Sequence, residues 1–75
     1  MKLPLAILNV LIASPRAINP AVIRGFLPSF TGKDHTLKDI EHALRDLETK
    51  GFVKGTESQF HGVLWKITED GRLEL

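Results

Sequence analysis

The sequence predicts a small α+β domain in which three helices are followed by a β-hairpin. Its 75 residues, 43% hydrophobic and 25% charged, have the composition of one soluble globular domain. Helix-start signals precede apolar stretches in the first 50 residues, and two extended runs separated by a polar turn come after them. No linker, repeat or low-complexity tract divides the chain. We therefore expect residues 1–75 to form a single domain.

The first helix is expected within residues 1–13. Pro4 stands in its first turn, where the missing N–H costs nothing, and Ser14-Pro15 ends it. Pro4 and Asn9 interrupt the apolar run, and a membrane span needs about 20 apolar residues, so a secretory signal or membrane anchor is not expected. The density of apolar residues predicts a helix covered on most sides: Leu5, Ile7, Leu8, Leu11 and Ile12.

The second helix is expected to start at Asn19-Pro20, with Asn19 as the cap and Pro20 in the first position. It should end before Pro28, and residues 28–35 are expected to form a loop. A short strand, Arg16 to Ile18, is expected to join the sheet of the hairpin. The apolar side of this helix should consist of Val22, Ile23, Phe26 and Leu27.

The third helix is expected over residues 36–50. Thr36 followed by Asp39 resembles a capping box, and Gly51 ends the helix. The inward side has the 3-4-3 spacing of an amphipathic helix: Leu37, Ile40, Leu44 and Leu47. We expect this side to pack against the first helix.

The hairpin is expected to pair residues 52–57 with residues 63–68 through the polar turn 58–62. Alternation in the second run places Val63, Trp65 and Ile67 on one face, and Trp65 is expected in the core. Leu64, Lys66 and Thr68 occupy the other face.

The segment LKDIEHALRDLETKGFVKGTESQFHGVLWKITEDGR resembles the third helix and hairpin of winged helix-turn-helix DNA-binding domains, most closely those of the MarR and PadR regulator families. The shared positions are Leu47, Glu48, Gly51, Phe52, Val53, Trp65, Lys66, Ile67, Thr68, Glu69 and Gly71. The resemblance covers residues 36–72 closely and the first 35 residues only in the order of their elements. It implies a cytoplasmic prokaryotic or phage transcriptional regulator that needs no cofactor, binds double-stranded DNA, and forms a homodimer or joins a larger assembly. The third helix would enter the major groove, and the hairpin 52–68 would be the wing.

Two features differ from that pattern. The link between the second and third helices is about eight residues, longer than the usual 3–4-residue turn. Charge is also unevenly distributed. Residues 1–33 contain four basic and no acidic residues, whereas residues 34–75 contain six basic and nine acidic residues. The third helix has a net charge of −1, from three bases and four acids. A DNA-binding role therefore depends on where each charge lies.

Helical geometry separates these charges, because successive residues turn by about 100°. His42 lies opposite the inward leucines, with Lys38, Asp39 and Arg45 beside it, whereas Glu41 and Glu48 flank the core. Arg and Lys donate to guanine, and Asp accepts from the amino group of cytosine. A solvated helix face is the alternative interpretation.

The turn of the hairpin is expected to lie along the sugar-phosphate backbone, with Lys54 supplying charge. Phe60 is expected to pack on the sheet or to contact a partner. Arg24 and Lys33 are candidate phosphate contacts. The predicted DNA-contacting residues are Arg24, Lys33, Thr36, Lys38, Asp39, His42, Arg45, Lys54, Ser58, Gln59 and His61.

Catalysis is not expected, because the chain has no cysteine, Gly-rich phosphate loop or nucleophile motif. His35, Asp39 and His42 share a helical stripe, but no recognised ligand motif is present and no metal site is predicted. Two hypotheses remain. A DNA-binding regulator predicts a basic surface that joins Arg24, Lys33, Lys38, Arg45 and Lys54. A winged-helix module for protein interactions predicts an apolar patch around Phe30 and Phe60.

Overall fold

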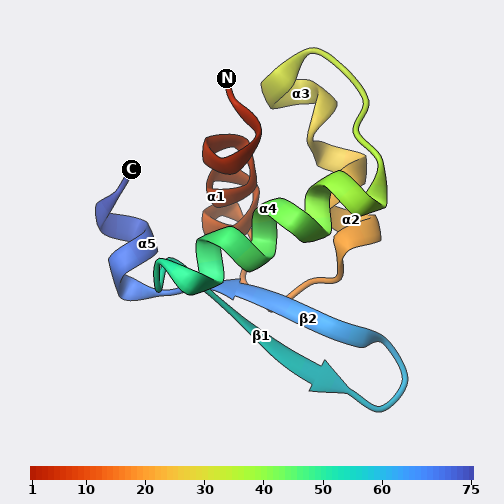
Figure 1. The fold of residues 1–75 in the computed structure, drawn as a ribbon, viewed down its shortest axis with the longest axis vertical. Coiled ribbons are helices and arrows are strands. Elements are labelled where there is room, and N and C mark those ends of the chain that lie inside the picture. The colour runs from red at the N-terminus through yellow and green to blue at the C-terminus, as the bar shows by residue number, and fades with distance from the viewer.

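The computed structural model describes all 75 residues and confirms an α+β domain (Figure 1). Its helices are α1 (Leu3–Ala13), α2 (Pro20–Phe26), α3 (Pro28–Thr31), α4 (Leu37–Thr49) and α5 (Glu69–Leu73). Strands β1 (Val53–Ser58) and β2 (Gly62–Ile67) form one antiparallel hairpin. No helix has both the length and the apolar character that a bilayer crossing requires.

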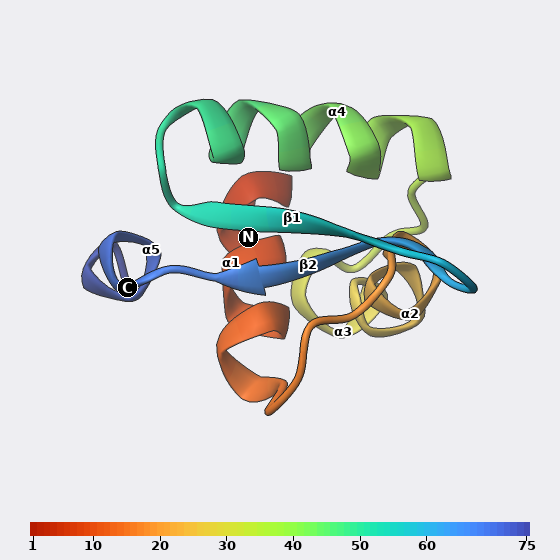
Figure 2. The same cartoon turned by 90° about the horizontal axis from the view of Figure 1, so that it is seen from below.

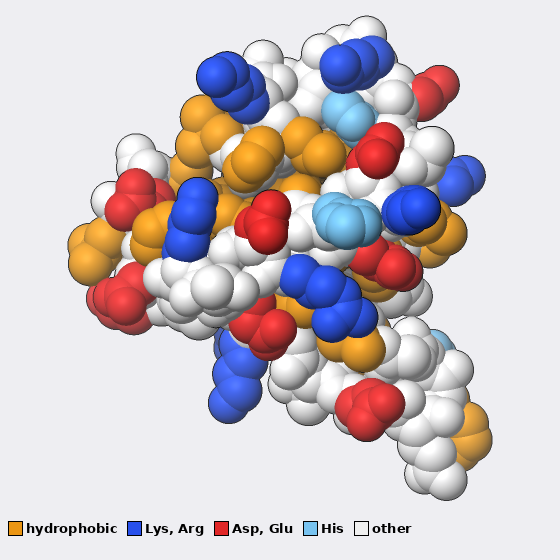
Figure 3. All heavy atoms as spheres, in the orientation of Figure 1, with side chains coloured by type: hydrophobic (Ala, Val, Ile, Leu, Met, Phe, Trp, Pro, Cys, Tyr) orange, Lys and Arg blue, Asp and Glu red, His pale blue; other side chains and the backbone are white.

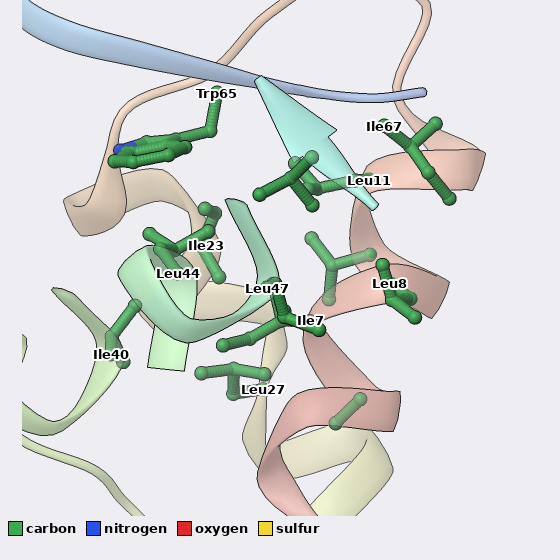
Figure 4. Packing of buried hydrophobic residues seen from close by; sticks show 13 residues of the cluster. Ile7, Leu8, Leu11, Ile23, Leu27, Ile40, Leu44, Leu47, Trp65 and Ile67 are labelled. Atoms are coloured by element: carbon green, nitrogen blue, oxygen red, sulfur yellow. The ribbon is translucent and has the colours of Figure 1, made fainter. Parts of the chain in front are cut away.

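The core is one cluster of 13 buried hydrophobic residues between α1, α2, α4 and the inner face of the hairpin (Figure 4). Packing of α4 against α1 is confirmed, as is the place of Trp65, which is 5% exposed, in the core. The largest side chains that are fully buried are Ile7, Leu11, Ile23, Leu27, Ile40 and Leu44. Two come from each of α1 and α4, and Ile23 and Leu27 come from α2 and the residue that follows it, so α4 is anchored along most of its length.

Some apolar residues expected inside are exposed. The first helix is less covered than predicted, because Leu5 and Ile12 lie on a side of α1 that faces solvent, 41% and 45% exposed. Of the four residues expected on the apolar side of the second helix, Val22 and Phe26 are exposed, and only Ile23 and Leu27 reach the core. Leu37 is 38% exposed because it stands in the first turn of α4, at the edge of the core.

The prediction of a loop over residues 28–35 is wrong for its first half, which forms α3. Pro28 occupies the first helical position of α3, where its missing N–H is not needed, so it begins a helix as well as ending α2. Leu27 stays helical between the two segments, and Gly32, at a φ of +77°, ends α3. The ten residues 27–36 between α2 and α4 therefore contain a helical turn.

The short helix α5 was also not expected. Thr68 caps it by accepting a hydrogen bond from the backbone N–H of Gly71 at 3.1 Å. The Thr68 hydroxyl also donates to the carbonyl of Gly51 at 2.6 Å. The Thr68 side chain therefore connects the end of β2 to Gly51, in the turn between α4 and β1.

Both ends of α4 follow the sequence prediction. Thr36 accepts from the backbone N–H of Asp39 at 3.1 Å, which is the N-terminal half of the expected capping box. At the other end, Gly51 has a φ of +81°. The backbone N–H of Gly51 donates to the backbone carbonyl of Glu48, and that of Phe52 donates to the backbone carbonyl of Leu47. These two bonds form a Schellman motif, which turns the chain directly into β1.

The hairpin has the predicted alternation. Val53 pairs with Ile67 and Ser58 with Gly62, which leaves a three-residue loop, Gln59 to His61. The expected short strand is present as one bridge, in which Ile18 and Trp65 exchange backbone hydrogen bonds of 3.0 and 2.7 Å. We call β1, β2 and their loop the wing. Figure 2 shows the wing running alongside α4.

Candidate nucleic-acid interface

The side of α4 opposite the core is exposed to solvent. Lys38, Asp39, His42 and Arg45 are all exposed, as the helical geometry predicts. Ile40 and Leu44, with no exposed surface, hold the helix from the other side. These four polar side chains therefore stand on a rigid helix, in its first two and a half turns.

A cleft lies between α4 and the wing, and Arg45 stands at its centre. It consists of two neighbouring pockets of about 240 and 370 Å³ that share Arg45, Val63 and Trp65. Pro20 and His61 close one end, next to the start of α2 and the loop of the wing. The structure thus brings together two of the predicted contact residues, Arg45 and His61.

The cleft also holds acidic residues that the sequence prediction left out. Glu41 and Glu48 line it from α4, and Glu57 lines it from β1. The carboxylate of Glu48 accepts a hydrogen bond from the backbone N–H of Gly55 at 3.1 Å, which connects α4 to the wing. Strand alternation was the available signal for Glu57, because it shares a face with Val63 and Trp65.

Lys54 lies on the other face of the wing. Residues 55, 57, 63 and 65 line the cleft, so the alternation of β1 turns Lys54 away from α4. It therefore does not share a surface with Arg45. Figure 3 shows Lys, Arg, Asp and Glu side chains interspersed over the visible face, rather than the continuous basic surface that the DNA hypothesis predicts.

The wing loop presents exposed side chains but contains no Lys, Arg, Asp or Glu. Gln59, Phe60 and His61 are exposed, whereas Ser58 is half-buried within the last pair of the hairpin. Phe60 is 83% exposed, so the expectation that it packs on the sheet is wrong and contact with a partner remains. The positive φ of Gly62, +71°, allows the tight return into β2.

The remaining predicted contacts lie around α2, α3 and the start of α4. Arg24 is exposed on α2, one turn after Pro20 at the edge of the cleft. Lys33 is exposed in the connection after α3, and Thr36 is exposed at the cap of α4. No Lys or Arg side chain appears as a donor in the hydrogen bonds of the chain.

The histidine stripe has a structural role at one end. The Nε2 atom of His35 lies 3.0 Å from the hydroxyl of Thr31, so this ring braces the connection between α3 and α4. No three His, Asp or Glu side chains in the chain gather closely enough to hold a metal ion.

The two phenylalanines of the interaction hypothesis do not form one patch. Phe30 is half-buried against the core and lines a separate apolar pocket of about 160 Å³ with Val10, Ala13 and Phe26. The helix α3 and the wing loop lie at opposite ends of the molecule (Figure 1). A single apolar surface around Phe30 and Phe60 is therefore absent.

Two solved structures share this fold at low sequence identity. The ferric uptake regulator Fur of Helicobacter pylori superposes with a TM-score of 0.79 at 21% identity, over 89% of this chain and 44% of that chain. A proposed transcriptional regulator from Thermoplasma acidophilum has a TM-score of 0.76 at 20% identity, over 96% of this chain and 71% of that chain. This chain therefore spans less than half the length of the Fur chain. No protein-family model and no curated protein sequence matches the chain. Together the likenesses show a winged-helix fold of the type found in these two regulators.

Proposed function

We propose that this domain is a DNA-binding module of a transcriptional regulator and that α4 is the helix that enters the major groove. The observation that carries the proposal is the outer side of α4, where Lys38, His42 and Arg45 are exposed on a helix fixed by buried Ile40 and Leu44. A rigid helix that presents donors and acceptors outward is the element with which winged helices and other helix-turn-helix domains read base edges.

The position of the wing supports the same proposal. It runs beside α4 and its loop carries exposed Gln59 and His61, which can donate hydrogen bonds to phosphate or sugar oxygens. The resemblance to MarR and PadR regulators agrees with this arrangement, and so do the two regulators that share the fold. Dimer formation and a prokaryotic or phage origin stay part of the proposal.

The acids in the cleft limit the strength of this binding. Glu41, Glu48 and Glu57 surround Arg45, so phosphates would be repelled there unless base contacts offset the repulsion. We therefore expect weak affinity for random duplex and a clear gain on a preferred sequence. Because few basic side chains lie on this side, about three to five phosphates should be neutralised per protomer, which gives a slope of log affinity against log salt of roughly −2.7 to −4.5.

The test is a titration of the protein into fluorescently labelled duplexes at several salt concentrations. Measurable binding at low salt that weakens linearly on the logarithmic scale supports the proposal. No binding on several duplexes at low salt would overturn it.

A second function is favoured by one observation, the 83% exposure of Phe60 next to an acid-lined cleft. Those features suit a protein partner that supplies a basic group to the cleft and an apolar site to Phe60. Capture of such a partner in the absence of any DNA affinity would identify the domain as an interaction module.

A further inference from the structure

The face of the wing that turns away from α4 carries two lysines directly opposite each other. The register of the hairpin pairs Lys54 with Lys66, and both side chains are exposed. We call this side, with Lys54, Thr56, Leu64 and Lys66, the outer face of the wing. Like charges directly opposite each other destabilise an antiparallel pair. The hairpin therefore carries a repulsion that a bound anion would relieve.

The charge of the outer face contrasts with that of the cleft. No acid occupies it, because Glu57 belongs to the inner face, with Val63 and Trp65. The first acids after Lys66 along the chain are Glu69 and Asp70, which begin α5 beyond the end of the sheet.

The direction of the outer face separates it from the proposed groove-binding side. Arg45 and Glu48 of α4 meet the inner face of the wing across the cleft, and the outer face looks the opposite way. Lys54 and Lys66 therefore point away from a duplex that α4 holds.

We propose that the outer face of the wing is a second nucleic-acid contact, which takes phosphates of a DNA segment other than the one held by α4. The inference rests on the proposed function and extends it, because one domain would then join two segments. Charge complementarity carries it: two lysines directly opposite each other, on a face without an acid, fit the phosphates of a nucleic-acid backbone.

The experiment measures retention and bridging separately. An unlabelled duplex is fixed to a surface, the protein is bound to it, and capture of a second, labelled duplex is recorded. The variants are wild type, Lys54→Gln/Lys66→Gln, and the charge-matched control Lys2→Gln/Lys50→Gln, whose lysines lie outside the wing. Thermal unfolding checks that every variant is folded.

We expect wild type and the control to be retained and to capture the second duplex, and the Lys54→Gln/Lys66→Gln variant to be retained but to lose at least tenfold of the capture. Equal capture by all three variants, or equal loss in the control, would overturn the inference and leave the proposed function standing. Failure of wild type to be retained would overturn both. Lysine-dependent binding of polyglutamate without capture of the second duplex would assign the face to an acidic protein and overturn the inference.

Discussion

Leu37 and Leu44 lie seven residues apart on the same helix, and the sequence pattern gives them the same inward position. In the structure Leu44 has no exposed surface, whereas Leu37 is 38% exposed. Periodicity describes a direction around the helix axis, but the depth of the core beside each turn depends on the neighbouring helices. A residue in the first turn can therefore point inward and still lie at the edge of the core.

Leu44→Ala should lower the free energy of unfolding by about 2–5 kcal/mol, because it leaves a cavity in the centre of the core. Leu37→Ala is the matched control, with the same residue type in the same helix, and should cost clearly less. Urea denaturation of the three proteins measures both. Similar losses in the two variants would show that the core is not centred where the structure places it.

Two glycines should respond to alanine with opposite signs. A Cβ at Gly71 would collide with the backbone oxygen of Phe52 and crowd Ile67, so Gly71→Ala should destabilise the domain by about 1–3 kcal/mol or more. Gly25 has nothing within 4 Å of its Cβ position and lies in α2, so Gly25→Ala should stabilise it by roughly 0.5–1 kcal/mol. Thermal unfolding of both variants tests this, and a shift of the same sign in both would contradict it.

At the scale of elements, the sequence was sufficient for α4 and the hairpin because their signals are strong and local. The cap at Thr36, the Schellman glycine Gly51 and strict alternation in β2 each fix a boundary or a face. The helices α3 and α5 were missed because four or five residues are too few to show periodicity, and Pro28 reads equally as a stop and as a first helical residue. The sequence could not predict that Lys54 and Arg45 lie on different surfaces. That placement depends on how the wing packs against α4, and no local sequence pattern contains this information.

The link between the hairpin and the turn after α4 is expected to depend on Thr68. Thr68→Ala removes both its bond to Gly51 and the cap of α5, and should cost about 0.5–2 kcal/mol. Thr68→Ser retains the hydroxyl and should recover most of that loss. Denaturant unfolding and hydrogen exchange of the α5 amides would show it, and an equal loss in both variants would mean that the methyl group, not the hydroxyl, matters.

At the scale of the whole molecule, the net charge is only +1, so function depends on where the individual basic and acidic side chains lie. Basic side chains lie on the outer side of α4 and on the outer face of the wing. Between these two surfaces is a cleft that contains three acidic residues. Net charge alone therefore predicts almost no affinity for DNA. The account requires that recognition come from the few side chains that α4 presents, with Arg45 as the main donor to base edges.

The measurement that tests this claim most directly compares Arg45→Ala with wild type on two duplexes, a preferred sequence selected from a random pool and a random control. The account predicts a loss of about 1–3 kcal/mol on the preferred duplex and little change on the control, so that discrimination falls. Lys54→Ala should instead leave binding to each single duplex, and therefore discrimination, unchanged, because Lys54 faces away from α4. If Arg45→Ala binds the preferred duplex as tightly as wild type, or weakens both duplexes equally, α4 does not read DNA in this protein.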